Sequence, residues 1–189
     1  MGLGDTDMAA DCREMLDFWF SDAMRRRWFA STPKLDAEIR DRFEGLWQQA
    51  AAGTLDAWQE TPEGALALVI VLDQLPRNMY RGRPESFSTA QQAVAVAKHA
   101  IEHGFDQRIG KDRLAFLFMP LMHSERLDDQ DASVRLFAGA GLADNLRWAE
   151  HHRDIVRRFG RFPHRNAILG RESTREEQDY LASPRAFKG

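Results

Sequence analysis

Apolar residues recur at helical spacing along almost the whole chain. They fall three or four positions apart, which gives a segment one apolar face and one polar face. Six segments are read as helices on this basis: residues 8–20, 35–51, 93–101, 113–122, 127–138 and 142–159. No segment alternates apolar and polar residues as a half-buried strand does, and no hairpin signal is present. The pattern predicts an all-α protein.

Residues 65–72 differ from the other segments because they are apolar on every side. Thr61 is a favoured N-cap residue, and Pro62 fits the first helical position, so we expect a helix to begin there. A helix without a polar face has to be surrounded by other elements. We therefore expect this helix at the centre of the fold.

Two further helix starts carry a local signal. Ser88 and Gln91 have the spacing of a capping box before residues 93–101. Thr174 and Glu177 have the same spacing and predict a last short helix.

Prolines mark the chain at nearly equal intervals. Four of the seven prolines make up this series: Pro33, Pro76, Pro120 and Pro163. The interval suits one helix pair per unit, as in arrays of helical hairpins. Pro120 lies inside residues 113–122 and is expected to bend or break that helix, because proline has no N–H and clashes with the preceding turn.

Helix alternation gives the interval a spatial meaning. Successive helices joined by short loops run antiparallel. The helices predicted to end near Leu75, Met122 and Phe159 are every second helix, so their C-terminal ends are expected on one side of the molecule. We predict one domain over residues 1–189, a short solenoid of antiparallel helix pairs, with fraying confined to residues 1–7 and 183–189.

The composition narrows the classes of function. Hydrophobic residues make up 43% of the chain, charged residues 29%, and the net charge is -3, which is typical of a soluble globular protein. A nucleic-acid-binding protein needs a broad basic face, so that class is excluded. Cys12 is the only cysteine and fits a reducing cytoplasm. No apolar run approaches the ~20 residues that span a bilayer, and no signal peptide is recognised, so we expect a cytoplasmic protein without a membrane partner.

Three motifs stand out: LDQLPRNMYRG from Leu72, FLFMPLMHSERLDDQ from Phe116 and RFGRFPHRNAILGRESTREE from Arg158. Together they resemble the bacterial domain of unknown function 924 family. The resemblance implies an all-helical fold like that of tetratricopeptide repeats, a right-handed superhelix, and it supplies no activity. Leucines stand at three positions where the family pattern leads us to expect phenylalanine: Leu35, Leu75 and Leu121. These exchanges are apolar and leave the polar motifs intact.

Polar and cationic residues gather at the predicted proline-marked corners. The first cluster is Asp73, Arg77, Asn78 and Arg81; the second is His123, Ser124, Glu125, Asp129 and Gln130; the third is Arg161, His164, Arg165, Asn166 and Arg171. His152 belongs to an apolar series one helix face away and is expected to point inward. Helix alternation predicts that the clusters surround a common pocket.

One hypothesis is a binding site for a small anionic ligand, such as a phosphorylated molecule. Arginine forks suit phosphate and carboxylate groups, and helix N-termini add partial positive charge. The residues proposed to bind the ligand are Asp73, Arg77, Asn78, Arg81, Gln130, Arg161, Arg165, Asn166 and Arg171. The residues proposed for acid–base catalysis are His123, His152, His164 and Glu125, since imidazoles titrate near neutral pH. The sequence leaves open whether any reaction occurs.

The alternative is that the polar clusters only lock helix ends together. In that interpretation Asp73 pairs with Arg77 on a helix that ends between them, and Glu125 pairs with Arg165. The protein would then be an interaction scaffold whose concave face holds a protein partner. The sequence leaves both hypotheses and the oligomeric state open.

A metal site or a cofactor is not predicted. His99 and His103 lie four positions apart, but charged residues flank them, and a solvated helix face explains them better. Cys12 falls in an apolar series, which favours packing over a reactive thiolate. The five tryptophans are interpreted as core anchors: Trp19, Trp28, Trp47, Trp58 and Trp148.

Overall fold

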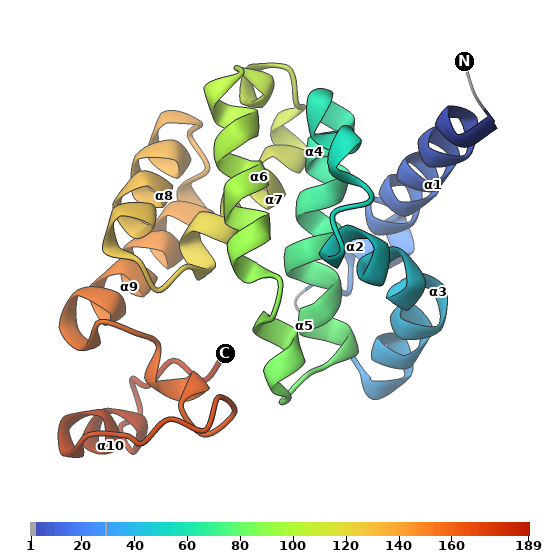
Figure 1. Ribbon diagram of the computed structural model, residues 1–189. Coiled ribbons are helices and arrows are strands. Elements are labelled where there is room, and N and C mark those ends of the chain that lie inside the picture. The colour runs from blue at the N-terminus through green and yellow to red at the C-terminus, as the bar shows by residue number, and fades with distance from the viewer. Residues whose placement is uncertain (1–2, 29) are drawn as a thin grey trace. The chain divides into compact units, whose positions relative to one another are not determined.

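The computed structural model describes the backbone of residues 3–28 and 30–189, and the side chains of residues 10–28 and 30–189. The described residues contain helices and turns and no strand, which confirms the predicted all-α class (Figure 1). None of the described helices combines the length and the apolar character that crossing a membrane requires. The predicted fraying of residues 1–7 lies partly outside the described residues, and α1 begins at Leu3.

The α-helices follow one another in the order α1 Leu3–Trp19, α2 Asp22–Arg25, α3 Pro33–Ala51, α4 Pro62–Val69, α5 Leu75–Met79, α6 Ala90–Glu102, α7 Lys111–His123, α8 Leu127–Gly139, α9 Ala143–Phe159 and α10 Arg175–Leu181. Short 3-10 helices stand between them at Asp56–Glu60, Pro84–Phe87, Phe105–Gln107 and Pro163–Arg165. A π-helical segment, Ile70–Gln74, joins α4 to α5.

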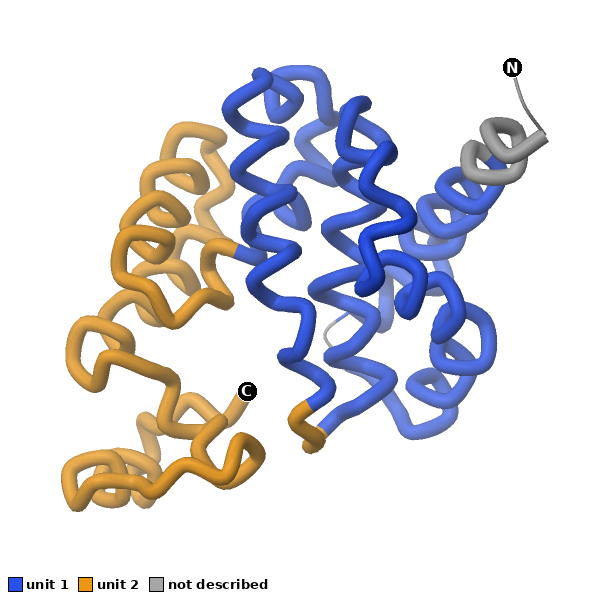
Figure 2. The backbone as a smooth tube through the Cα atoms, viewed as in Figure 1, with its two compact units in different colours: residues 1–81, 85–120 blue, residues 82–84, 121–189 orange. Residues whose placement is uncertain are grey.

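The helices group into two compact units (Figure 2). Unit 1 holds the described residues up to Arg81 together with Glu85–Pro120, and unit 2 holds Gly82–Pro84 and Leu121–Gly189. The single-domain organisation of the chain stays a prediction.

The centre of unit 1 is the continuous helical stretch of α4 and the π-helical segment. Each of residues 65–72 is at most 2% exposed, which confirms the predicted central helix. The helix begins as expected: the Thr61 hydroxyl accepts a hydrogen bond from the N–H of Gly64, and Pro62 occupies the first turn. The neighbouring α1 and α6 cover this stretch.

The prediction that this helix ends near Leu75 is wrong. The backbone stays helical through the π-helical segment and α5 to Met79, although Pro76 lies inside it. Pro76 has no N–H to donate to the carbonyl of Leu72, four residues earlier. The hydroxyl of Thr89 donates to that carbonyl at 2.6 Å. A residue from another part of unit 1 therefore satisfies the carbonyl that a proline would leave without its usual donor.

The predicted capping box at Ser88 is also wrong. The helix α6 begins at Ala90, and its N-cap residue is Thr89, whose side chain makes no capping bond. Ser88 donates to the carbonyl of Glu85 instead. The Thr89 hydroxyl, besides donating to Leu72, accepts from the indole N–H of Trp47 at 3.2 Å. These long-range bonds take the hydroxyl away from the helix start.

The helix α7 continues through Pro120 to His123. Of the predicted bend or break, the break is therefore wrong, and the bend stays a prediction.

Unit 2 is built on the pair α8 and α9, which lie side by side along their length. A turn of three residues joins them, and Gly141 adopts a φ of 63° there. Gly160, with a φ of 70°, ends α9 after Phe159 as predicted. Ile155, Val156 and Phe162 are buried between α9 and the C-terminal segment.

The C-terminal part of unit 2 confirms the second predicted capping box. The Thr174 hydroxyl accepts from the N–H of Glu177, and the Glu177 carboxylate accepts from the N–H of Thr174. Both bonds satisfy backbone donors at the start of α10.

Candidate functional site

The first predicted cluster lies in unit 1 and contains a buried ion pair. Asp73 Oδ1 accepts from Arg77 Nε at 3.2 Å and from Arg77 Nη2 at 3.1 Å, which confirms the predicted pairing. The Asp73 side chain is 1% exposed, and Gln74 donates a further hydrogen bond to its other oxygen. The Arg77 guanidinium also lies 5.4 Å from the ring centre of Phe87. The helix does not end between Asp73 and Arg77, so the pair sits within a continuous helical stretch.

The other residues of this cluster converge on Asp36, in the first turn of α3. Asn78 Nδ2 donates to Asp36 Oδ1 at 2.9 Å, and Arg81 Nε donates to Asp36 Oδ2 at 3.0 Å. Ser31 adds a third donor at 2.6 Å. Partial burial alone would raise the pKa of Asp36, but the hydrogen bonds from Arg81, Ser31 and Asn78 lower it. Asp36 is not among the residues predicted for the site, although an acidic residue in the first helical turn, three residues after Pro33, was a signal for it.

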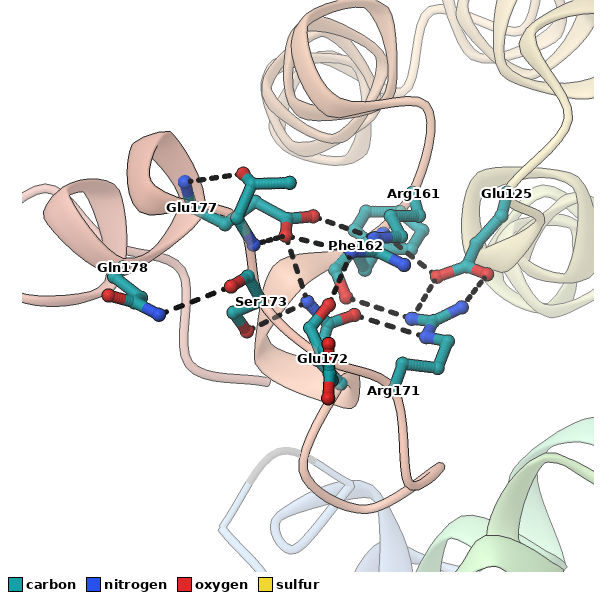
Figure 3. A network of polar contacts seen from close by, with 10 residues as sticks. Glu125, Arg161, Phe162, Arg171, Glu172, Ser173, Glu177 and Gln178 are labelled. Carbon is teal, nitrogen blue, oxygen red and sulfur yellow. Dashed lines mark hydrogen bonds and ion pairs between the residues drawn. The ribbon is translucent and has the colours of Figure 1, made fainter.

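In unit 2, Glu125 is the carboxylate of a two-bond ion pair (Figure 3). Arg171 donates from Nη1 to Oε2 at 2.7 Å and from Nη2 to Oε1 at 2.9 Å. The N–H of Phe162 donates to the same carboxylate at 2.8 Å. Burial opposes ionisation, but these bonds and the charge of Arg165 lower the pKa of Glu125. The guanidinium that hydrogen-bonds Glu125 is thus that of Arg171, not that of Arg165 as predicted.

A second carboxylate, Glu177, organises the segment before α10. Arg161 donates to it from Nε at 2.7 Å and from Nη2 at 2.8 Å, and Asn166 Nδ2 donates at 3.2 Å (Figure 3). The hydrogen bond from Arg161, followed by those from the N–H of Thr174 and from Asn166, lowers the pKa of Glu177 to about 2, although burial opposes this. From the sequence, Glu177 was predicted only to cap α10. Its second role has no local signal, because its partners come from an earlier loop.

Asn166 connects the two carboxylates, because it bonds Glu177 directly and bonds Arg171, the partner of Glu125. Its Oδ1 accepts from Arg171 Nε at 3.0 Å, while its Nδ2 donates to Glu177 and to Ser173. We call the set Glu125, Arg161, Asn166, Arg171 and Glu177 the corner network. The guanidiniums of Arg161 and Arg171 each bond a carboxylate, and the amide of Asn166 has partners on both its oxygen and its nitrogen. This geometry favours a structural role for Arg161, Asn166 and Arg171.

Gln130 stabilises the turn between α7 and α8 through hydrogen bonds to its backbone. It is fully buried, and its Nε2 donates to the carbonyl of Met122 at 2.7 Å and to that of Ser124 at 2.6 Å. Ser124 donates to Asp129 Oδ2 at 2.6 Å. Gln130 therefore satisfies carbonyls at the end of α7, which a helix leaves without intrahelical donors.

Nitrogen-bearing side chains also gather around Phe162, which is fully buried. The ring centroid of Phe162 lies 5.4 Å from that of His152 and 5.6 Å from that of His164. The guanidinium carbon of Arg165 lies 4.3 Å from the same centroid. His152 is 5% exposed, so it points inward as predicted, and Arg165 is 6% exposed. We call His152, His164 and Arg165 with Phe162 the Phe162 cluster.

His152 is held as a neutral imidazole. Its Nδ1 lies 2.7 Å from the carbonyl oxygen of Trp148, which places the proton on Nδ1 and leaves Nε2 as an acceptor. Burial lowers the pKa of His152 to about 3, and the positive charges of His123, His151 and Arg165 act in the same direction. The hydrogen bond to Trp148 opposes the shift only in part.

The predicted site residues thus fall into separate groups. Asp73, Arg77, Asn78 and Arg81 belong to unit 1, and His123, Glu125, Gln130, His152, Arg161, His164, Arg165, Asn166 and Arg171 belong to unit 2. Within unit 2 the third cluster divides into the corner network and the Phe162 cluster. The common pocket of all three clusters stays a prediction.

Metal-ligating types do not gather in the part of the chain that the structure describes, where no group of three or more His, Cys, Asp and Glu residues could hold a metal ion. His99 and His103 stack with ring centroids 4.0 Å apart. Cys12 is half-buried, and burial raises the pKa of its thiol to about 11, which disfavours a reactive thiolate.

The tryptophans differ in their exposure. Trp19 and Trp58 are buried core residues as predicted, at 1% and 6% exposure. Trp148 is 54% exposed, so the core interpretation is wrong for it. Its position on α9 faces outward, and its ring borders His151 and Phe187.

Comparison with known proteins gives two matches. The sequence model of a family described as bacterial protein of unknown function, DUF924, matches residues 15–185. The solved structure of a protein of unknown function from Agrobacterium tumefaciens is similar, with a TM-score of 0.88 and 41% sequence identity over 93% of this chain and 98% of that chain. No curated protein matches the chain.

Proposed function

The chain belongs to the DUF924 family of bacterial proteins of unknown function, and we propose from its own geometry that unit 2 binds a small anionic ligand at the Phe162 cluster. The observation that carries the proposal is the gathering of His152, His164 and Arg165 around one buried phenyl ring. Imidazoles and a guanidinium together suit the recognition of an anion, although the charge of Arg165 also acts on the Glu125 carboxylate.

The electrostatics of the cluster suit an anion. The charges that act most strongly on His152 are those of His123, His151 and Arg165, and all of them disfavour its protonation. An anion placed among these groups would reverse that balance and raise the pKa of His152. Binding would then be linked to the uptake of a proton, so affinity would rise as the pH falls.

The corner network has a supporting role in this proposal. Arg171 and Glu125 fix the backbone of Phe162 through its carbonyl and its N–H, at 3.3 and 2.8 Å. The loop that carries His164 and Arg165 is thereby held in place. Arg161 and Asn166 act on the same loop through Glu177.

The residues of unit 1 that were predicted to bind the ligand are proposed only as secondary contacts. Arg77 and Arg81 each bond a carboxylate of unit 1, Asp73 and Asp36. A ligand would have to compete with those carboxylates, so Arg77, Asn78 and Arg81 are assigned to stabilising unit 1 first.

Acid–base catalysis is an extension of the binding proposal. The Nε2 of neutral His152 is a proton acceptor, and His123 and His164 offer further imidazoles in unit 2. Glu125 is held ionised by Arg171, which suits an electrostatic role better than proton donation. A reaction is worth seeking only for molecules that first bind.

The experiment compares anion-induced stabilisation in matched variants. Thermal unfolding of the wild type is measured with inorganic phosphate and with citrate, against chloride at equal ionic strength. Arg165→Met keeps an apolar stem on Phe162 and removes the charge, and His164→Gln removes one imidazole. Arg158→Gln is the control, because Arg158 pairs with Glu176 on the surface. We expect stabilisation of the wild type and the control, and its loss in both cluster variants. Equal responses in all four proteins, or none in the wild type, would overturn the proposal.

A second candidate is a protein-binding scaffold with a superhelix like that of tetratricopeptide repeats, working in the cytoplasm. The observation that favours it is the exposure of two large apolar side chains of unit 2, Trp148 at 54% and Leu127 at 42%. Exposed tryptophans are enriched among residues that dominate protein interfaces. A partner retained by the wild type should be lost on Trp148→Glu and kept on Arg147→Glu, a charge change at the exposed neighbouring residue.

A further inference from the structure

The segment after α10 returns to the Phe162 cluster. The ring of Phe187 lies 4.5 Å from that of His152 and 5.0 Å from that of His164, centroid to centroid. Both contacts are edge-to-face, with interplanar angles of 66° and 85°. Phe187 is the half-buried cover over the two imidazoles that the proposed function assigns to the ligand.

The end of the segment borders His164 as well. A Cβ atom at Gly189 would lie 3.2 Å from His164 Cδ2 and 3.4 Å from its Nε2. The backbone of residue 189 therefore runs beside the edge of the imidazole that carries Nε2. Phe187 and Gly189 together cover the polar side of His164.

The ring of Phe187 packs against the buried core of unit 2 and also borders the rings of Trp148 and His151. The backbone of the segment is held by only a few local hydrogen bonds. The N–H of Phe187 donates to the hydroxyl of Tyr180 at 2.9 Å, and the N–H of Ala186 donates to the carbonyl of Ser183 at 3.1 Å. Residues 183–189 form no regular helix, and Lys188 and Arg185 are exposed. A segment anchored through one half-buried ring, with little backbone hydrogen bonding, opens at lower cost in free energy than a packed helix.

The segment contrasts with the α10 helix that precedes it. The corner network anchors α10 through Glu177, which is 2% exposed and accepts bonds from Arg161, Asn166 and Thr174. The anchor ends before Ser183. The fold thus joins a fixed helix to a less firmly held segment, residues 183–189, that reaches back to His152 and His164.

We infer that residues 183–189 form a displaceable strap that blocks the Phe162 cluster, so that Phe187 and an anionic ligand exclude one another. This inference rests on the proposed function for its ligand but not for the strap itself. A phenyl ring offers neither charge nor a hydrogen bond to an anion, so an anion that reaches both His152 and His164 has to displace it. The apparent affinity for the anion equals the intrinsic affinity multiplied by the fraction of molecules in which the strap is open.

Phosphate titration by calorimetry tests the competition. Phe187 contacts both imidazoles, so Phe187→Ala is expected to tighten phosphate binding by up to about tenfold, which corresponds to ~1.4 kcal/mol. Tyr180→Phe keeps the ring that packs on Phe159 and removes the acceptor of the Phe187 N–H, so it should tighten binding by a smaller factor. Lys188→Gln is the control for the loss of a nearby charge and should not tighten binding.

A second measurement needs no ligand. Diethyl pyrocarbonate acylates accessible neutral imidazoles, and mass spectrometry assigns the rate to each histidine. Phe187→Ala should speed the modification of His152 and His164 several-fold and leave His99 unchanged. Equal rates in wild type and variant overturn the strap, as does equal phosphate affinity where phosphate binds. Faster modification without phosphate binding in either protein supports the strap and overturns the proposed function.

Discussion

Arg171 and Glu125 meet through two parallel hydrogen bonds of 2.7 and 2.9 Å, although 46 positions separate them in the chain. The pair ties the turn after α7 to the loop before α10. Both side chains are about a quarter exposed, at 25% and 27%. A planar guanidinium matches a carboxylate in a way that the point charge of an ammonium cannot.

Replacing Arg171 should separate geometry from charge. Arg171→Ala leaves Glu125 half-buried without its partner, and we expect a loss of about 2–3 kcal/mol in the free energy of unfolding. Arg171→Lys keeps the charge but loses the fork, and should recover less than half of that loss. Urea unfolding monitored by circular dichroism measures both. Full recovery by lysine would mean that charge alone matters here.

Glu177 and Glu176 form a matched pair for testing the second carboxylate. Glu177 is buried and bonded to Arg161 and Asn166, whereas Glu176 pairs with Arg158 on the surface, with both side chains more than half exposed. We expect Glu177→Ala to cost about 3 kcal/mol and Glu176→Ala to cost at most ~0.5 kcal/mol. Similar losses in the two variants would contradict the assigned role of Glu177.

Thr89 and Ser88 distinguish the observed bonding from the capping box that the sequence suggested. Thr89→Val removes the hydroxyl that donates to the Leu72 carbonyl and accepts from Trp47. Because that carbonyl is buried beside Pro76, we expect a loss of about 1–3 kcal/mol. Ser88→Ala removes only a bond on the surface and should change stability by at most ~0.5 kcal/mol. A larger loss at Ser88 than at Thr89 would restore the capping interpretation.

The buried imidazole of His152 predicts a fall in stability on mild acidification. The unfolded chain has a normal histidine pKa of 6.5, and burial lowers the folded value to about 3, with His123, His151 and Arg165 acting in the same direction. Above pH 6.5 neither state binds the proton, so the contribution of His152 is constant. Below pH 6.5 only the unfolded state binds it, and stability falls as the pH approaches 3. Between pH 8 and pH 5.5 the loss should be about 1.4 kcal/mol.

His152→Leu provides the comparison for that measurement. The variant lacks the titrating group. Between pH 8 and pH 5.5 it should therefore lose about 1.4 kcal/mol less stability than the wild type. Glu177 and Glu125 have lowered pKa values and titrate below this window, so they do not disturb it. An unchanged pH dependence in the variant would show that His152 is not held neutral.

Local sequence signals predicted the elements whose ends are decided locally. Thr61 and Thr174 cap helices with their own neighbours, and Gly160 ends α9 through its own backbone conformation. The inward position of His152 followed from helical periodicity alone. Such features depend on residues within one or two turns, which a sequence displays directly.

The errors arose where a distant residue decided the outcome. Pro76 signals a helix end, but the Thr89 hydroxyl satisfies the Leu72 carbonyl and the helix continues. The third cluster holds three arginines, Arg165 was the expected partner of Glu125, and the path of the loop brings Arg171 to it instead. Residue spacing cannot resolve such choices, because they depend on which side chains the tertiary fold brings together.

Trp148 gives unit 2 an optical probe at a useful place. Its indole is exposed and lies 6.2 Å from the ring of Phe187, whereas Trp19 and Trp58 are shielded in unit 1. Trp28 and Trp47 are half-buried, so soluble quenchers such as iodide should dim Trp148 most strongly, and opening of residues 183–189 should change both the extent of quenching and the emission wavelength. Intrinsic fluorescence can follow that motion in real time without a label.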